Sequence, residues 1–571
     1  YETERPNSLY DPSGSFQSIN RRYDIVYGDV MLNFNYNIRR FDIAATLGWT
    51  GRYENMNNMR VSTNGGLVTE NWFDLNASRY TASSTLQRME LLKTGYMGTL
   101  SLGWDNYLFL ELTGRQERSS TLKDKSFFYP SANLSFLFSN AFRMPAWWNH
   151  GKLRLSYGIV GNAPETYAAN IIYEQGSDNG FTWNYVPSSW GNANIRPEKK
   201  YEYEIGLESK FLNNRLGFDV SYYNNRVKDQ ILSTPQPSSS GVKYVLMNVG
   251  EVANEGWDIS VSATPVLTKN FRWDLTANYG IYRNKVVKLA EGVPYLEISN
   301  IGGGGAKIQA VEGRPMGDIY VQMPQMNENG DYLVSDKGLY LNQTDLQRVG
   351  NINPDGVGGL FSSFSYKNIF LDFSIDFRIG GDVINEMYQY STASGLTPES
   401  LQYRDTEHGG LSYYYPGNNN ASGTPVQVDP SSGAGPNGEI IYHDGIILPG
   451  VVASTGEKNT RIIPAGYYYN QTYNWGTQSE QLTYRHSVFD NTYVKLRELT
   501  IGYQFPEKLT AKLGMTRLSV SIFGRNLFYF YKALKNYDAE SSVGTSWASQ
   551  AVVGGSTTAT RNFGVSLRAS F

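Results

Sequence analysis

The segment IFLDFSIDFRIGGD, residues 369–382, shows most clearly the residue pattern that indicates the fold class of this chain. Its first nine residues place an apolar side chain at every second position, at Ile369, Leu371, Phe373, Ile375 and Phe377. Most positions between them are polar, including Asp372 and Asp376. Successive side chains of a β-strand point to opposite faces, so this period of two predicts a strand with one apolar and one polar face.

The same period recurs along the whole chain. It predicts about fifteen strands, most of them about ten residues long, which is the length of a tilted strand that crosses a membrane. The predicted spans are 30–37, 41–49, 95–104, 106–115, 127–139, 151–160, 201–211, 215–230, 244–264, 271–284, 357–366, 369–379, 491–504, 516–530 and 560–571. A soluble β-sandwich would also alternate in this way, so alternation alone leaves the class open.

The connections between these strands also alternate, between short and long. Short ones are predicted at 38–40, 105, 140–150, 212–214, 265–270, 367–368 and 505–515. Long ones are predicted at 50–94, 116–126, 161–200, 231–243, 285–356, 380–490 and 531–559. Short periplasmic turns and long extracellular loops are typical of an outer-membrane barrel, so we predict an all-β, transmembrane antiparallel β-barrel.

This layout also predicts how the chain is divided. The long last loop makes the last strand run toward the periplasm, and tracing back makes the first strand do the same. Residues 1–29 are then expected to be the remnant of an extracellular loop, and residues 30–571 the C-terminal portion of a barrel. An odd number of strands does not close a barrel of even parity, so we expect earlier strands to be absent from this sequence.

The composition excludes several other classes. Charged residues make up 18% of the 571 residues and aromatic residues 14%, whereas an ordinary soluble domain has about 25% charged residues. The net charge of −3 does not provide the basic field of a nucleic-acid binder. No apolar run is long enough for a spanning helix. Without cysteine, and with four scattered histidines, the chain carries no hydrolase motif and no paired metal spacing, and we expect no enzyme.

Three ordered motifs resemble the SusC/RagA type of TonB-dependent outer-membrane transporter. The first is RVGNINPDGVGGLFSSFSYKN at 348–368, followed by Asp382 and Asn385 after a Gly-Gly pair. The second is NTYVKLRELTIGYQFP at 491–506, followed by Gly524, Asn526 and Leu527. The third is Arg561–Gly564 with a terminal Phe571, and EGRPMGDIY at 312–320 also resembles a loop of the family. One departure is Ala539, where the family typically has proline.

The resemblance implies a larger assembly than this chain. It implies a barrel of about twenty-two strands, filled by an N-terminal plug, of which the plug and about seven strands would be missing here. It also implies a TonB-contacting segment in that missing part and a SusD-like surface lipoprotein as partner. The implied location is the bacterial outer membrane, in contact with its lipid, and the dimer of transporter–lid pairs is expected from the family only.

Candidate site residues follow from residue type. Aromatic side chains in the long loops stack on sugar rings or peptide side chains, or else pack the loops together. The candidates for substrate binding are Trp72, Trp183, Trp190, Tyr413, Tyr414, Tyr468 and Trp475. Asp372 and Asp376 are expected to face the lumen, in a transport role or paired with nearby Arg or Lys. Phe571 is expected to be a barrel-insertion signal, or simply part of the interfacial aromatic girdle.

One segment weakly resembles a calcium loop. The residues with oxygen ligands are Asn327, Asn329, Asp331 and Asp336, but the acidic first position and the terminal bidentate Glu are missing. The Asn-Gly pair within it is equally a hairpin-turn signal. We therefore expect no cofactor, with calcium as the alternative.

The predicted function is TonB-dependent import of oligosaccharides or oligopeptides as the barrel component of a SusCD-like complex. One alternative is a passive porin or an autotransporter-type barrel. A second is a secreted β-rich glycan-binding or glycan-cleaving protein. Nothing in the sequence distinguishes glycan from peptide cargo.

Overall fold

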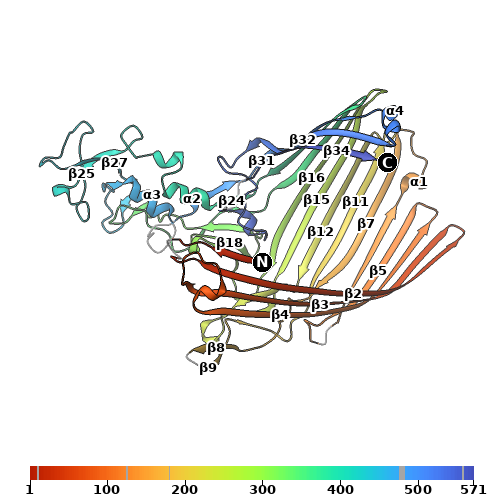
Figure 1. The fold of residues 1–571 in the computed structure, drawn as a ribbon, viewed down its shortest axis with the longest axis horizontal. Coiled ribbons are helices and arrows are strands. Elements are labelled where there is room, and N and C mark those ends of the chain that lie inside the picture. The colour runs from red at the N-terminus through yellow and green to blue at the C-terminus, as the bar shows by residue number, and fades with distance from the viewer. Residues whose placement is uncertain (9–11, 124–125, 179–180, 475–482, 556–558) are drawn as a thin grey trace. The chain divides into compact units, whose positions relative to one another are not determined.

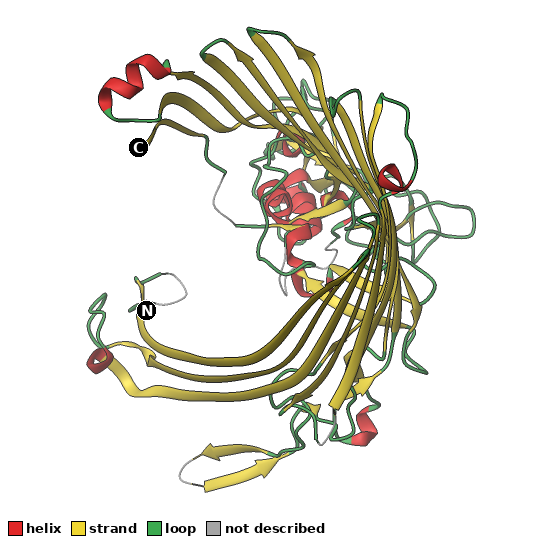
Figure 2. Ribbon diagram, turned by 90° about the vertical axis from the view of Figure 1, so that its right-hand side faces the viewer, coloured by secondary structure: helices red, strands yellow, loops and turns green. Residues whose placement is uncertain are grey.

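The computed structural model describes residues 1–8, 12–123, 126–178, 181–474, 483–555 and 559–571. Within these residues, sixteen strands form an antiparallel sheet in which neighbours follow one another in chain order. Strands dominate and helices are short, as the colours of Figure 2 show. None of the described helices combines the length and the apolar character needed to cross a membrane. The predicted antiparallel, all-β class is confirmed.

The chain divides into two units, and each is described by itself. Unit 1 comprises residues 1–209 and 222–253, and unit 2 comprises residues 210–221 and 254–571. The sheet strands of unit 1 are β1 (Glu2–Arg5), β2 (Ser15–Ile38), β3 (Phe41–Leu67), β4 (Ser78–Trp104), β5 (Leu108–Ser119), β6 (Ser126–Phe136), β7 (Trp148–Asn162) and most of β11 (Glu198–Phe211). Residues of β12 (Leu216–Lys228) belong to both units.

Unit 1 also holds short elements between these strands. They are η1 (Leu75–Ala77), α1 (Phe138–Ala141), β8 (Glu174–Asp178), β9 (Phe181–Tyr185), β10 (Ser189–Trp190), β13 (Ile231–Pro235), η2 (Ser238–Ser240) and β14 (Tyr244–Asn248). Strands β8 and β9 pair as a hairpin, and β10, β14 and β13 form a small separate sheet. The predicted loop at 161–200 therefore contains strands.

Strands β2, β3 and β4 lie side by side in Figure 1 and are 24, 27 and 27 residues long. They are far longer than the nine to eleven residues that roughly suffice to cross a bilayer. The predicted long loop at 50–94 is therefore wrong for most of its length, because β3 and β4 continue their pairing from Phe41↔Trp104 to Leu67↔Ser78. Backbone pairing with a neighbour extends these strands beyond the alternating segments.

The expected loop at residues 1–29 is also wrong. Strand β1 pairs antiparallel with the start of β2, with Glu2 opposite Ser18 and Arg5 opposite Ser15. The polar side chains of this segment predict a loop, but its backbone groups form hydrogen bonds in the ladder. All fifteen predicted strands correspond to strands of the sheet, and β1 is the sixteenth. The odd number of strands, from which absent earlier strands were predicted, is therefore wrong.

The remaining sheet strands belong to unit 2. They are β15 (Glu251–Leu267, most of it in this unit), β16 (Phe271–Lys288), β22 (Gly356–Tyr366), β23 (Ile369–Ile379), β31 (Tyr493–Gln504), β32 (Arg517–Lys532) and β34 (Asn562–Ser570). The predicted tight turn between β22 and β23 is present, with Lys367 in the left-handed region at φ 51°. Strand β23 has the bounds predicted from its sequence.

Pairing across unit 2 aligns apolar side chains in a row. Phe364 lies opposite Leu371, Leu371 opposite Ile501, Ile501 opposite Ile522, and Ile522 opposite Val565. Ile501, Ile522 and Val565 are 54%, 65% and 71% exposed. A continuous exposed apolar surface on a sheet is typical of a barrel wall that faces lipid.

The predicted loops of unit 2 are folded as well. Between residues 285 and 356 lie β17 (Tyr295–Ile301), η3 (Gly302–Gly304), β18 (Ala306–Val311), β19 (Asp318–Val321), β20 (Leu333–Val334) and β21 (Gln347–Asn351). Four of them, β17, β18, β19 and β21, form a sheet around the buried residues Ile308, Ile319 and Val321. The segment at 285–356 is therefore largely an ordered sheet with its own core.

The segment at 380–490 holds the helices α2 (Glu386–Ala393) and α3 (Ala465–Tyr473), which contact each other. Its other elements are β24 (Asp382–Asn385), η4 (Pro398–Leu401), β25 (Leu411–Tyr414), η5 (Pro416–Asn418), β26 (Val426–Gln427), β27 (Ile441–Ile446), β28 (Val451–Val452), β29 (Ile463–Pro464), η6 (Arg485–Ser487) and β30 (Val488–Asp490). After it come α4 (Glu507–Thr510), η7 (Ala511–Leu513), η8 (Ser549–Ala551) and β33 (Val552–Val553). Strand β24 pairs with both β30 and β33.

Candidate functional site

Two of the sequence motifs meet at a buried carboxylate in unit 2. Asp318 has no exposed surface and forms ion pairs with Arg314, Nε to Oδ2 at 2.6 Å, and with Arg348, Nε to Oδ1 at 2.9 Å. The side-chain amide of Asn351 donates to the same carboxylate at 2.9 Å. A buried carboxylate is stable only when paired and hydrogen-bonded. These contacts join the segments 312–320 and 348–368.

Asp382 attaches the second of these segments to β24. Its Oδ2 accepts a hydrogen bond from the backbone N–H of Asn351 at 2.9 Å. A Cβ on Gly350 would lie 2.3 Å from the same oxygen, so this close approach requires glycine. The Gly-Asn pair at 350–351 and the Gly-Gly-Asp stretch at 380–382 thus meet in one hydrogen bond, from the Asn351 N–H to Asp382.

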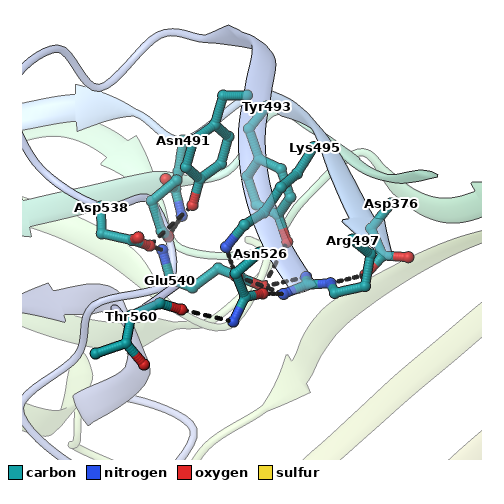
Figure 3. Close-up of polar contacts among 11 residues, drawn as sticks. Asp376, Asn491, Tyr493, Lys495, Arg497, Asn526, Asp538, Glu540 and Thr560 are labelled. Atoms are coloured by element: carbon teal, nitrogen blue, oxygen red, sulfur yellow. Dashed lines mark hydrogen bonds and ion pairs between the residues drawn. The ribbon is translucent and has the colours of Figure 1, made fainter. Parts of the chain in front are cut away.

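The motif at 491–506, with Asn526 after it, forms a charged network around Glu540, which Figure 3 shows. Arg497 donates from Nη2 to Oε1 at 2.5 Å and from Nη1 to Oε2 at 2.8 Å, and its Nε donates to Asp376 at 2.6 Å. Lys495, only 2% exposed, pairs with Glu540 at 2.6 Å. Nη1 of Arg497 also donates to the Asn526 side-chain oxygen at 3.0 Å. We call Asp376, Lys495, Arg497, Asn526 and Glu540 the Glu540 network.

This network attaches the segment after β32 to the sheet. The Tyr529 hydroxyl and the backbone N–H of Glu540 both donate to Asp538, at 2.8 Å each. The Asn491 side chain donates to the carbonyl of Ala539 at 3.0 Å. Burial tends to raise the pKa of Glu540, but the hydrogen bonds from Arg497 and Lys495 hold that pKa at about 2. Ala539, which stands where the family typically has proline, takes part in this attachment only through its backbone carbonyl.

A separate cavity of about 570 Å³ is lined mainly by the segment that contains α2 and α3, together with Tyr340 of an earlier segment. Its size is that of an ordinary small-molecule pocket. Six tyrosines contribute to its lining: Tyr340, Tyr388, Tyr403, Tyr468, Tyr469 and Tyr473. Ile446, Leu448 and Pro449 form part of its aliphatic lining. We call it the tyrosine cavity.

The tyrosine rings contact one another in series. Tyr473 lies edge-on to Tyr388, with ring centroids 6.4 Å apart, and 5.9 Å from Tyr469. On its other side it stacks on His486 at 5.7 Å. Burial raises the pKa of Tyr468 and of Tyr469 to about 12, so their hydroxyls are neutral and can both donate and accept.

Arg485 and His486 bring a positive charge to the lining. The Arg485 Nε–H donates to His486 Nε2 at 2.8 Å, which requires that ring nitrogen to be unprotonated. Burial, and then the charge of Arg485, lower the pKa of His486 to about 4. The imidazole is therefore neutral near pH 7, and the charge of the pair belongs to Arg485.

Of the aromatic residues predicted to bind substrate, one lines this cavity, Tyr468. Tyr413 is 1% exposed on β25, stacks on Tyr442 and donates to Asp444 at 3.1 Å. Tyr414 also lies on β25 and is outside the cavity lining. Trp475 lies outside the described residues.

The three tryptophans predicted to bind substrate belong to unit 1. Trp72 lies between β3 and β4 and is 56% exposed. Trp183 lies on β9 and is 48% exposed, and Trp190 lies edge-on to Tyr173 at 5.8 Å. Substrate contact by these side chains stays a prediction.

The other candidates have clear contacts. Asp376 pairs with Arg497, as one of the two interpretations predicts, whereas Asp372 accepts a hydrogen bond from Ser363 at 2.5 Å. Their orientation toward a lumen stays a prediction. Phe571 follows β34 and is 84% exposed, and its role in insertion also stays a prediction.

The calcium-like segment forms a tight turn. The Asn327 side-chain oxygen accepts from the backbone N–H groups of Asn329 and Asp331, at 3.0 and 2.9 Å. Asp336 accepts from Ser454 at 2.6 Å. Within the described ranges, no three His, Asp or Glu side chains are grouped so that they could hold a metal ion. These contacts support the hairpin interpretation of the Asn-Gly pair.

Sequence reasoning missed most of the tyrosine cavity. Tyr469 and Tyr473 are four residues apart on α3, so both lie on one helical face. Residues 380–490 are predicted to be a loop, and in a loop a spacing of four residues does not indicate a shared face. The run Tyr467–Tyr469 followed by Tyr473 is the signal that could have indicated a helix with an aromatic face.

An antiparallel sheet with an exposed apolar row and with folded segments between its strands is that of an outer-membrane β-barrel protein. The β-barrel of the "TonB dependent receptor-like" family matches residues 1–318, more than half of the chain, and the chain belongs to that family.

Individual relatives agree with this assignment. TonB-dependent receptor P3 of Formosa agariphila is 23% identical over 483 residues, which are 78% of this chain and 42% of that protein. TonB-dependent receptor SusC of Bacteroides thetaiotaomicron is 27% identical over 247 residues, 39% of this chain and 24% of SusC. The chain thus spans less than half the length of these curated relatives.

Solved structures show the same fold. The RagAB peptide transporter matches with a TM-score of 0.67 at 19% identity, over 94% of this chain and 55% of that one. The RagAB peptide importer in the open–open state matches with a TM-score of 0.71 at 18% identity, over 100% of this chain and 57% of that one. The resemblance to SusC/RagA proteins drawn from the sequence motifs is confirmed.

Proposed function

We propose that this chain is the barrel part of an energy-coupled importer that takes oligosaccharides or oligopeptides across the bacterial outer membrane. The observation that carries the proposal is that unit 2 combines a barrel-type sheet with a tyrosine cavity of about 570 Å³. Aromatic faces and hydroxyls suit the rings and polar groups of such cargo. The chain would perform no bond-breaking chemistry.

The proposal includes two partners. TonB would supply energy from the inner membrane, and a SusD-like lipoprotein would cover the extracellular side. Membership in the family supports the first partner, and the likeness to SusC and RagAB supports the second. RagAB is described as a peptide importer, which supports peptide as one class of cargo.

Uptake in the bacterium that produces the protein tests the proposal. Cells are given fluorescent oligosaccharides or oligopeptides, with and without the gene, and with and without an uncoupler of the proton motive force. We expect uptake of at least one cargo class to require both the gene and the proton motive force. Gene-dependent uptake that survives the uncoupler would instead establish a passive porin.

Solubility provides the second test. A membrane barrel requires detergent for extraction, whereas a secreted β-rich glycan-binding protein dissolves in buffer. Extraction of the intact protein without detergent would overturn the proposal.

A further inference from the structure

We propose that the tyrosine cavity binds a ligand that carries a carboxylate, and that this carboxylate pairs with Arg485. The inference deepens the proposed function, on which it rests, by naming the charge of the cargo. It follows from the contacts of one arginine and the chemistry of the surfaces around it.

Arg485 lines the cavity, and among the described residues no carboxylate forms an ion pair with it. Its Nε is used by His486 at 2.8 Å, and its backbone N–H donates to Thr483 at 3.2 Å. No Asp or Glu oxygen of the described chain lies within ion-pair distance of its guanidinium. By contrast, Arg497 pairs with two carboxylates in the Glu540 network. A partly buried cation that lacks such a partner favours an anionic ligand.

One other charged side chain lines the cavity. Glu399 belongs to η4 and is exposed. No ion pair joins Glu399 to Arg485, and the attraction between a solvent-exposed charge and a charge beyond contact distance is weak. It therefore leaves Arg485 available for an external anion.

The number of charges favours a carboxylate over a phosphate. His486 accepts a hydrogen bond from Arg485 and is neutral, so the pair provides one positive charge. A guanidinium with two terminal nitrogens matches the two oxygens of a carboxylate in a bidentate pair. A phosphate dianion would keep an excess negative charge in a lining that is otherwise aromatic and aliphatic.

The remaining lining determines what the carboxylate is attached to. Tyr468, Tyr469 and Tyr473 contribute aromatic rings, while Ile446 and Leu448 are aliphatic. The Tyr469 hydroxyl donates to the Glu399 carbonyl at 2.8 Å, so Tyr469 contributes its ring alone. This combination suits a ring or an apolar side chain with a few polar groups. Two sources share that chemistry, a uronic acid within an oligosaccharide and the C-terminal residue of a peptide.

Direct binding to the purified full chain in detergent separates these sources. The probes form two matched pairs: methyl glucuronide with methyl glucoside, and N-acetylphenylalanine with its amide. Calorimetry should show the anionic member of one pair binding about tenfold or more tightly than its neutral partner, as expected for a charged hydrogen-bonded pair. The pair that shows the difference identifies the source.

Substitution of Arg485 tests the assigned contact. Arg485→Gln should abolish the preference for the anionic probe while leaving affinity for the neutral one, which also reports that the cavity is intact. Arg461→Gln is the matched control, because Arg461 is exposed in the same segment and does not line the cavity. That variant should bind like the unaltered chain.

The outcomes that overturn the inference are distinct from failure of the importer proposal. Equal affinity for charged and neutral probes in the unaltered chain overturns the inference without any variant. An unchanged preference in Arg485→Gln overturns it as well. If that variant does not fold, Arg485→Lys should retain a weakened preference, and a full preference would count against the bidentate contact. Binding requires neither TonB nor transport, so loss of uptake with binding intact rejects only the importer.

Discussion

Arg497 and Glu540 form a bidentate ion pair between β31 and the segment that follows β32, with nitrogen–oxygen distances of 2.5 and 2.8 Å. The two residues are 43 positions apart, and Lys495 binds the same carboxylate from the same strand at 2.6 Å. The pair therefore determines where the residues after β32 lie against the sheet (Figure 3). Sequence motifs at 491–506 and around Asn526 converge on this one carboxylate.

Glu540→Gln should destabilise the protein. The change leaves Lys495, which is 2% exposed, without its carboxylate. Because the Glu540 side chain is itself 31% exposed, water can partly replace the lost partner, and the expected cost is about 1–3 kcal/mol. Unfolding in urea in lipid vesicles measures the loss. The control is Glu498→Gln, because Glu498 pairs with an arginine whose side chain is 57% exposed, where a pair contributes about 0–1 kcal/mol. Equal losses in both variants would contradict this account.

The same carboxylate predicts a dependence on pH. The pKa of Glu540 in the folded protein is about 2, below the ordinary value of 4.5. A group whose pKa is lowered by folding stabilises the protein above its unfolded pKa, and this contribution is lost as the pH falls toward the folded pKa. The free energy of unfolding should therefore decrease between about pH 4.5 and 2. Glu540→Gln should flatten that part of the curve.

Gly350→Ala should disrupt the contact with Asp382. The new Cβ would lie 2.3 Å from Asp382 Oδ2, so the carboxylate must move away from the Asn351 N–H. Overpacking of this kind costs about 1–3 kcal/mol. Thermal unfolding measures it, with Gly433→Ala as control, because a Cβ there meets nothing within 4 Å. A stable Gly350→Ala variant would show that the contact contributes little.

Tyr468→Ala should weaken binding of the better probe of the two pairs. Loss of a stacking ring from the cavity is expected to cost about 1 kcal/mol or more, which is a five- to tenfold change in affinity. Tyr414→Ala is the control, because Tyr414 lies on β25 outside the lining. Calorimetry compares the two. Equal effects would show that the cavity is not the binding site.

The exposed apolar row predicts a lipid-facing surface. Ile522 is 65% exposed, and a lysine there would place a charge in hydrocarbon at a cost of about 2 kcal/mol or more. Ser521→Lys is the control, because the adjacent residue of β32 points to the opposite face. Folding into lipid vesicles should be impaired by Ile522→Lys alone. Impairment by Ser521→Lys alone would reverse the assignment of the two faces.

The class of protein and most strands of the sheet could be predicted from local sequence patterns. Alternation is a local property of the strand, so β23 could be predicted with its bounds, and the short connection at 367–368 follows from where two alternating segments meet. The motifs around Asn351, Arg497 and Asn526 indicated the family from short stretches of sequence, and the match of residues 1–318 to the family then showed it.

Contacts between residues far apart in the chain could not be predicted from the sequence and are seen only in the folded structure. Strand β1, with its polar side chains, and the long extensions of β3 and β4 depend on backbone hydrogen bonds to a neighbour, which side-chain periodicity does not report. The Glu540 network joins residues more than 40 positions apart. Tyr340, Tyr388, Tyr468 and Arg485 come from four stretches of chain, and tertiary packing brings them into the lining of one cavity. The alternation of side chains along a strand depends on neighbouring residues, so it can be read from the sequence. The lining of a cavity depends on packing between distant residues, so it cannot.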